Sequence, residues 1–262
     1  MRTDLIDKIE RFNVFGTGFS RVEKLDVFKN LKDVKTNNTG YLSFPDSNVI
    51  ASAYRNEKLR IILNNSLITF ADGKFTEFYA TLKGEKKIRN ISGYDLLEHL
   101  LRSEKSHYFY GLNPSELHKL KEVITTHHPE ANILGYKSPP FLKLNEIESS
   151  EQIRKDIAVI NRLKPDFIWI GISSPKQDYL MSHYVNHLDQ GIMIGVGAVL
   201  LYKAGIVNKG PQWVKNLGMR WLFRFIQEPI RIWKKGSIKN ILFFLFLIVK
   251  HDIFRIELEG YE

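Results

Sequence analysis

The chain has 262 residues, 44% of them hydrophobic, and a formal net charge of +9. This size and apolar content allow one large α/β domain, or a domain with an appendage, to fold without cross-links. Because the chain has no cysteine, a structural disulfide and a thiolate metal site are both excluded. No segment has the pattern of a secretory signal, so we expect a protein on the cytoplasmic side.

Short apolar runs, each ending in glycine or a polar turn, recur along the first 208 residues. They predict strands over 67–70, 108–110, 133–134, 167–170 and 192–194. Helices are predicted over 115–125, after a start signal at Pro114, and over 150–163, closed by Pro165. Strands that alternate with helices predict a Rossmann-like α/β fold, with a largely parallel sheet and helices on both faces.

The carboxyl ends of these strands should meet at one edge of the sheet, where α/β proteins bind ligands. The residues expected there are Asp72, Gly111, Gly135, Pro175 to Gln177 and Gly197. Each glycine alone fits a helix cap or a tight turn. Their common placement favours a binding site, and the backbone N–H groups of the 195–197 turn would suit an anionic group.

Several ligand-binding motifs are incomplete or missing. Glycine pairs that begin at Gly16 and Gly195 start like dinucleotide fingerprints but lack the third glycine, so they are weak evidence for NAD. The chain has no Asp-x-Asp pair, no His-Glu-x-x-His motif and no P-loop, so we expect no metal site and no bound cofactor. His127 and His128, before Pro129, are expected at a solvated helix end.

The α/β pattern stops near 208–211, which predicts a core over 1–208 and an appendage over 209–262. Between 209 and 250 nine Lys or Arg residues accompany one acid, Glu228. From Trp213 to Trp233 aromatic and basic residues interleave, as in helices that lie on a bilayer surface. The apolar run 241–249 is too short to cross a membrane, which takes about 20 residues. It fits either a core helix or strand, or a segment in a lipid interface.

A basic, aromatic appendage also fits a different class of protein, a non-catalytic module that binds RNA or anionic lipid. The tryptophans and the neighbouring apolar run favour a membrane surface, because an RNA groove needs no such run. We therefore expect an anionic membrane surface as a partner and no nucleic acid.

From about Phe12 to Lys235 the sequence resembles the WecG/TagA/CpsF family of bacterial glycosyltransferases. The motifs that carry the resemblance, in the family's order and spacing, are Phe70-Ala-Asp72-Gly73, Ser92-Gly93-Tyr-Asp95-Leu96, Pro175-Lys-Gln177-Asp178, Gly195-Val-Gly197, Ala204-Gly205, Pro211-x-Trp213, Gly218-x-x-Trp221 and Gln227-Glu-Pro229-x-Arg231.

The resemblance implies an inverting enzyme that moves a sugar from a UDP-sugar, of the N-acetylmannosamine type or a related hexose, to a glycan on undecaprenyl diphosphate. Such an enzyme would act in capsule, exopolysaccharide or cell-wall polymer synthesis, peripheral on the inner face of the bacterial cell membrane. The UDP-sugar would be a substrate rather than a cofactor, and no metal is expected. A homo-oligomer is compatible with the sequence.

The resemblance also assigns roles to residues. It implies Asp72 as the catalytic base and Gln177 as a substrate contact; the alternatives are a helix N-cap for Asp72 and a solvent-facing side chain for Gln177. Further donor or acceptor contacts are implied at Asp46, Arg89, Asn90, Asp95, Gly195, Gly197, Arg224, Arg231 and either Lys234 or Lys235.

This chain departs from the family pattern where substrate is expected to bind. Phe44 and Asp46 stand where Thr-x-Asn is usual, and Asn90 stands where arginine is usual. Arg220 and Lys209 also differ from the usual residues. The resemblance therefore does not carry over the identity of the sugar.

The chemistry of such a transfer fits these residues. A sugar hydroxyl is a poor nucleophile near neutral pH, so a carboxylate such as Asp72 must take its proton as it attacks. The leaving UDP gathers negative charge on its diphosphate, which cations or turn N–H groups must compensate. Arg224, Arg231 and the 195–197 turn are the candidates.

Overall fold

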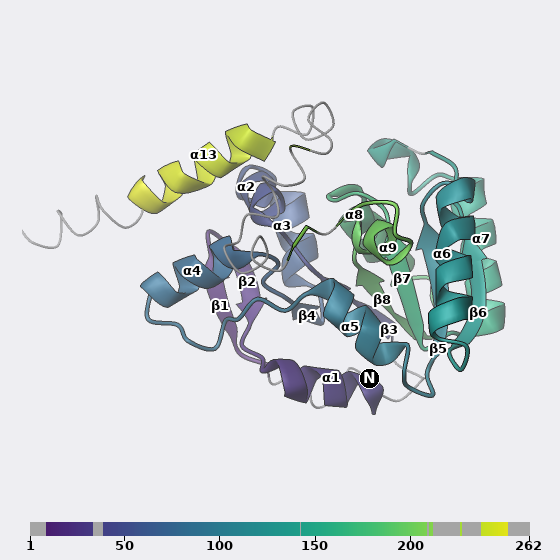
Figure 1. The fold of residues 1–262 in the computed structure, drawn as a ribbon. Coiled ribbons are helices and arrows are strands. Elements are labelled where there is room, and N and C mark those ends of the chain that lie inside the picture. The colour runs from purple at the N-terminus through teal and green to yellow at the C-terminus, as the bar shows by residue number, and fades with distance from the viewer. Residues whose placement is uncertain are drawn as a thin grey trace, which may run out of the picture.

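The computed structural model describes residues 9–33, 39–141, 143–208, 210–211, 226 and 237–250. Within these residues the core is a six-stranded parallel sheet of order β4-β3-β8-β7-β5-β6, accompanied by a β1–β2 hairpin (Figure 1). The strands are β1 (Arg11–Val14), β2 (Thr17–Ser20), β3 (Thr39–Ser43), β4 (Ile68–Thr69), β5 (Ser106–Gly111), β6 (Asn132–Lys137), β7 (Phe167–Gly171) and β8 (Gly191–Gly195). The predicted Rossmann-like α/β fold is confirmed.

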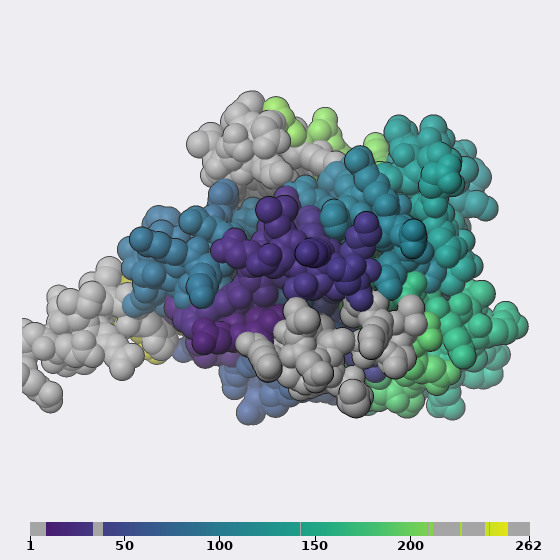
Figure 2. All heavy atoms as spheres, turned by 90° about the horizontal axis from the view of Figure 1, so that it is seen from below, coloured from purple at the N-terminus to yellow at the C-terminus, as the bar shows by residue number. Residues whose placement is uncertain are grey.

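Helices cover both faces of the sheet. One face carries α1 (Lys24–Lys32), α5 (Gly93–Leu100), α6 (Pro114–His127) and α9 (Val199–Lys203). The other carries α3 (Glu57–Asn64), α7 (Glu151–Leu163) and α8 (Lys176–Tyr184), with α2 (Ser47–Arg55) packed beside α3. A short 3-10 turn, η1 (Leu144–Glu146), precedes α7. The helix α4 (Lys74–Leu82) and the hairpin lie beyond the β4 edge. In Figure 2 the purple residues of the hairpin and α1 lie in the middle of the face seen from below, beside the blue residues of α4.

Side chains along the central strands alternate between the two faces. In β7, Phe167 and Trp169 pack with α1, α5 and α6, whereas Ile168 and Ile170 pack with α7 and α8. Because both faces are covered, these strands are near-continuous apolar runs, which is why they were predictable. The strand β3 was not predicted, since its sequence Thr-Gly-Tyr-Leu-Ser contains no such run.

The prediction that Gly135 lies at the carboxyl edge is wrong, because β6 continues through Gly135 to Lys137. The register between β5 and β6 shifts between His107 and Tyr108, so Leu134 is passed over. A Cβ at Gly135 would lie 2.8 Å from Tyr108 Cε2. This glycine therefore serves packing inside the sheet rather than a turn.

The prediction that His128 lies at a solvated helix end is also wrong. The helix α6 does end at His127, but His128 is only 8% exposed. Lys203, at the end of α9, contacts His128: its Nζ lies 2.7 Å from His128 Nε2 and 2.5 Å from Glu98 Oε1 of α5. Burial and the charge of Lys203 lower the pKa of His128. The contact ties α5, α6 and α9 together.

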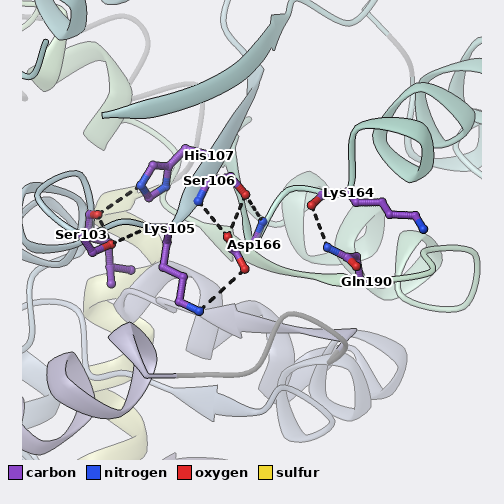
Figure 3. A network of polar contacts seen from close by, with 8 residues as sticks. Ser103, Lys105, Ser106, His107, Lys164, Asp166 and Gln190 are labelled. Atoms are coloured by element: carbon purple, nitrogen blue, oxygen red, sulfur yellow. Dashed lines mark hydrogen bonds and ion pairs between the residues drawn. The ribbon is translucent and has the colours of Figure 1, made fainter. Parts of the chain in front are cut away.

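A polar network joins the amino ends of β5 and β7 (Figure 3). Asp166 Oδ2 accepts hydrogen bonds from the N–H and the Oγ of Ser106, both at 2.8 Å. Nearby, Trp169 Nε1 donates to His107 Nδ1 at 3.1 Å, so the ring carries its proton on Nε2 and donates it to Leu100 O. Burial lowers the pKa of His107 to about 4. This network lies at the sheet edge opposite the predicted site and serves stability.

The apolar run near the C-terminus forms α13 (Ser237–Ile248), which packs across α2. Phe244 is fully buried, with its ring centroid 4.3 Å from that of Phe75 and 5.1 Å from that of Phe15. The opposite side of the helix is exposed, at Leu242, Leu245, Phe246 and Val249. The run is therefore part core helix and part apolar surface. None of the helices within the described ranges is both long and apolar enough to span a membrane.

Candidate functional site

Four neighbouring strands end side by side and carry the predicted residues. Because β4, β3, β8 and β7 are parallel neighbours, their carboxyl ends share one edge of the sheet (Figure 1). Asp72 follows β4, Asp46 follows β3, Gln177 follows β7 and Gly197 follows β8. The structure thus brings the predicted base and the predicted substrate contacts of these strands to a common edge.

Asn90 fixes the turn that carries Asp72. The N–H of Gly73 donates to Asn90 Oδ1 at 3.2 Å, and Ala71 and Asn90 form a parallel bridge. Gly73 has φ of 95°, which favours glycine, and it occupies the N-cap position of α4. The alternative role of Asp72 as the N-cap is therefore wrong. Asp72 lies one residue before the cap, half-buried at the sheet edge.

Two other predicted contacts take part in ion pairs. The exposed Arg89 directs Nη1 to Glu77 Oε1 on α4, at 3.4 Å, and Lys74 Nζ lies 2.8 Å from the other oxygen of Glu77. Burial acts to raise the pKa of Glu77, but hydrogen bonds and charges from the two cations lower it overall. Asp95 pairs with Lys24 of α1 at 2.7 Å.

Asp46 begins α2. Its Oδ1 accepts the N–H of Val49 at 2.9 Å, so the carboxylate caps the helix while it stays exposed at the edge. Two residues earlier, the buried ring of Phe44 stacks on that of Phe70, with centroids 4.6 Å apart. This stack joins the turns after β3 and β4. The departure from the family pattern at Phe44 thus creates an aromatic contact beneath the site.

Gln177 is 3% exposed, so the alternative of a solvent-facing side chain is wrong. Its Nε2 donates to Gly195 O at 3.1 Å. Its Oε1 is buried and has no hydrogen-bond partner among the described residues. A Cβ at Gly197, where φ is 52°, would lie 3.5 Å from this oxygen. The glycines of the 195–197 turn therefore leave room for the amide of Gln177.

The same turn does not offer free donors to an anion. The N–H groups of Val196 and Gly197 both donate to Ile170 O at 3.1 Å. The expectation that these N–H groups bind an anionic group is therefore wrong. Gly195 and Gly197 shape the site through their lack of a side chain, and their contact with substrate stays a prediction.

The sequence analysis did not assign a role to Asp178, which is 1% exposed. Burial, with a smaller contribution from the Asp46 carboxylate, raises the pKa of Asp178 to about 7, and the nearby Ser174 hydroxyl opposes the rise. An acid in the first turn of a helix is ordinarily exposed, so the residue type gave no signal. The buried positions Gln177, Leu180, Met181 and Tyr184 do follow helical spacing, and this pattern marks α8 as packed from its first turn.

The neighbouring strand ends are closely packed. Gly111 has φ of 135°, and a Cβ there would lie 2.6 Å from the carbonyl carbon of Gly171. The next residue, Leu112, has φ of 63° and donates its N–H to Gly171 O at 3.3 Å. Gly111, predicted at the carboxyl edge, does lie there. It allows the ends of β5 and β7 to approach closely.

The remaining predicted contacts, Arg224, Arg231, Lys234 and Lys235, lie outside the described residues, as does the departure at Arg220. Within the part of the chain that the structure describes, no group of three or more His, Cys, Asp or Glu side chains could hold a metal ion.

Comparison with known proteins gives one family match and several relatives. The profile of the glycosyl transferase WecG/TagA/CpsF family matches residues 12–256. Relatives named N-acetylglucosaminyldiphosphoundecaprenol N-acetyl-beta-D-mannosaminyltransferase occur in Bacillus subtilis strain 168, with 24% identity over 178 residues, or 66% of each chain. The Bacillus spizizenii relative is 22% identical over 76% of this chain and 75% of its own. The Staphylococcus aureus MW2 relative is 19% identical over 92% of each chain.

Proposed function

The chain belongs to the WecG/TagA/CpsF family of glycosyl transferases, and we propose that it moves a sugar from a UDP-sugar to an acceptor on undecaprenyl diphosphate. The names of its relatives specify an N-acetyl-β-D-mannosaminyl group and an N-acetylglucosaminyldiphosphoundecaprenol acceptor. We propose the same class of acceptor for this chain, with a donor of the N-acetylmannosamine type or a related hexose. The family relationship favours this function over a non-catalytic module that binds RNA or lipid.

The observation that carries the proposal is the grouping of Asp72, Asp46 and Gln177 at one edge of the sheet, after the parallel strands β4, β3 and β7. Asp72 would take the proton of the acceptor hydroxyl as that oxygen attacks the anomeric carbon from the side opposite the leaving UDP. The carbon–oxygen bond to UDP breaks as the new bond forms, which inverts the configuration. Gln177 would hold a polar group of the substrate through its unpartnered Oε1.

The negative charge of the leaving diphosphate still needs compensation. Since the N–H groups of Val196 and Gly197 are engaged, we propose that side-chain cations supply it, with Arg224 and Arg231 as the predicted residues. On this proposal the transfer needs no metal ion. Activity that survives a chelator would support the proposal, and activity restored only by a divalent cation would contradict it.

We further propose that the enzyme is peripheral on the inner face of the cell membrane, where a lipid-linked acceptor resides. Support comes from the exposed apolar side of α13, with Leu242, Leu245 and Phe246, and from the exposed Lys239 and Lys250 near its ends. The basic residues between 209 and 235 add charge that anionic lipid attracts.

The test is direct. The full-length protein is incubated with a panel of UDP-sugars and a short-chain polyprenyl-diphosphate N-acetylglucosamine, and the product is identified by mass and by the anomeric configuration of the new bond. Asp72→Asn serves as the inactive control. A β-linked disaccharide product from one donor would support the proposal. Failure with every donor, together with retention of single-stranded RNA, would instead support the binding module.

A further inference from the structure

The outer side of α4 carries apolar side chains that the core does not cover. Phe78 is 62% exposed and Leu82 is 58% exposed, whereas Thr76 and Ala80 on the opposite side of the helix are fully buried. With Phe75, the two exposed side chains follow the spacing of one helical stripe. Single exposed apolar side chains are common in proteins, but neighbouring ones on one stripe mark a surface that binds a partner.

This stripe adjoins α13. Phe75, at the start of the stripe, packs on Phe244 with ring centroids 4.3 Å apart, and the ring centroid of Tyr79 lies 6.3 Å from that of Phe244. Both helices lie beyond the β4 edge of the sheet (Figure 1). The exposed side of α13 holds further apolar groups, among them Phe246, which is 56% exposed. Two adjoining helices therefore expose apolar side chains at the same end of the molecule.

Basic residues follow α4 directly. Between 83 and 89 the chain has three lysines, one arginine and a single acid, Glu85. Glu85 Oε2 accepts a hydrogen bond from Arg21 Nε at 2.7 Å, so this acid is paired with a cation from outside the segment. The three lysines are all exposed: Lys83, Lys86 and Lys87. Positive charge beside the exposed Leu82 matches the surface of an anionic membrane, which combines apolar chains with negative headgroups.

We propose that the outer side of α4 and the lysines that follow it dock on an anionic lipid bilayer, as a second contact beside α13. This α4 surface consists of Phe78, Leu82, Lys83, Lys86 and Lys87. The inference deepens the proposed function and rests on its membrane-bound acceptor. Charge selects lipid over a second copy of this chain, because a symmetric contact between two α4 surfaces would set lysines against lysines.

The position of the α4 surface suits the transfer. The helix begins two residues after Asp72, and Phe78 follows about one turn later, roughly 6 Å along the axis. A helix held at the lipid interface would therefore keep the Asp72 turn close to the headgroups. A sugar joined to a membrane lipid through a diphosphate stays in the same layer, so docking through α4 would bring its hydroxyl to the proposed base.

The binding test sediments full-length protein with vesicles of phosphatidylethanolamine and phosphatidylglycerol over a salt series. The double variant Phe78→Ser with Leu82→Ser should lower partitioning by about tenfold or more at every salt concentration, because salt does not screen apolar insertion. Lys86→Gln with Lys87→Gln should lower it by roughly tenfold to thirtyfold at low salt and approach wild type at high salt. With vesicles of phosphatidylcholine alone, the effect of the lysine variant should disappear.

The matched controls lie elsewhere on the molecule. Phe141 is 88% exposed and follows β6, at the opposite end of the sheet from α4. Lys119 and Lys121 are exposed on α6. Phe141→Ser, and Lys119→Gln with Lys121→Gln, should bind vesicles as wild type does. An equal loss of binding in the controls and the α4 variants would overturn the inference, because total charge and apolar content would then explain it.

Light scattering tests the other occupant, a second copy of the chain. On the inference, the double variant at Phe78 and Leu82 has the same molar mass in solution as wild type. A wild-type dimer that this variant converts to a monomer, with unchanged vesicle binding, would show that the α4 surface is an interface between copies and would overturn the inference.

Activity separates the inference from the proposed function. Transfer is measured with the acceptor embedded in vesicles and with a water-soluble, short-chain acceptor. The α4 variants should raise KM for the embedded acceptor by about tenfold and stay within a few-fold of wild type on the soluble one. An equal loss of rate on both acceptors would overturn the inference, since α4 would then affect the Asp72 turn itself.

The two proposals therefore fail separately. If wild-type protein transfers sugar to neither acceptor, the proposed function fails, while sedimentation with vesicles still tests the α4 surface. If wild type transfers sugar and the α4 variants sediment with vesicles as wild type does, the function stands and the inference is wrong.

Discussion

At the scale of single residues, Asp72 and Asn90 depend on one backbone contact. The bond from the Gly73 N–H to Asn90 Oδ1 holds the turn in which Asp72 lies. In the family pattern an arginine is usual at the position of Asn90. In this chain an amide fixes the turn, and the neighbouring Arg89 pairs with Glu77 of α4. The departure therefore has a structural explanation.

Asp72→Asn should remove about two or more decades of kcat, because the amide cannot accept the proton of the attacking hydroxyl. Its melting temperature should barely change, since Gly73 and not Asp72 caps α4. Sugar transfer and thermal unfolding are measured together, with Asp26→Asn on the exposed first turn of α1 as the control. Full activity in Asp72→Asn, or its unfolding, would contradict the assignment.

Asn90→Ala should lower kcat by about tenfold with little change in KM, because the aspartate turn loses the acceptor for the Gly73 N–H and the base becomes less well placed. Asn90→Asp keeps an acceptor oxygen and should recover most of the rate. Steady-state kinetics of both variants check this. If KM for the donor rises instead while kcat holds, Asn90 contacts the substrate itself.

At the scale of elements, the sequence predicts best those strands that are buried on both faces. The strands β7 and β8 were predictable because both of their faces are covered, which demands continuous apolar runs. The strand β3 was not, since only Tyr41 and Leu42 are apolar within it. The burial of Asp178 was not predicted for a related reason, because it depends on the packing of α8 against β3 and β8, which no local pattern reveals. The motifs located Asp72 and Gln177, but not their partners.

The helix α13 divides its side chains between the core and an exposed surface, which gives a test of membrane docking. Phe246 is 56% exposed, so Phe246→Asp should fold normally yet reduce sedimentation with anionic liposomes. Loss of one inserted phenylalanine, about 1.5–3 kcal/mol, corresponds to roughly tenfold or more in partitioning. The control is Leu25→Asp on α1, where the side chain is 81% exposed. Equal binding by both variants and wild type would exclude α13 from the docking surface.

At the scale of the whole molecule, two buried groups oppose each other as the pH changes. His107 has a folded-state pKa of about 4, below its ordinary value near 6.5, so its contribution to stability is present above about 6.5 and lost as the pH falls toward 4. Asp178 behaves in the opposite way, with stability lost as the pH rises over nearly the same interval. The two effects partly cancel in the wild-type chain.

His107→Gln should remove the part of the pH dependence of the unfolding free energy that comes from His107. Glutamine can still accept from Trp169 and donate to Leu100 O, but it does not titrate, so the acid loss of about 3 kcal/mol should disappear. The unfolding free energy of this variant, from urea titrations at pH 4.5 and 7, should fall less on acidification than that of wild type. A variant that loses stability on acidification as wild type does would rule out His107 as the source.

The bonds from Val196 and Gly197 to Ile170 O have a consequence for product inhibition. On the proposed reaction, UDP left at this edge would lie near the carboxylates of Asp46 and Asp72 and would gain no hydrogen bond from the two amides. The edge would thus release the nucleotide readily once the sugar has left it. UDP should accordingly compete with the donor mainly through the cationic side chains proposed to compensate its diphosphate, so its affinity should fall as ionic strength rises.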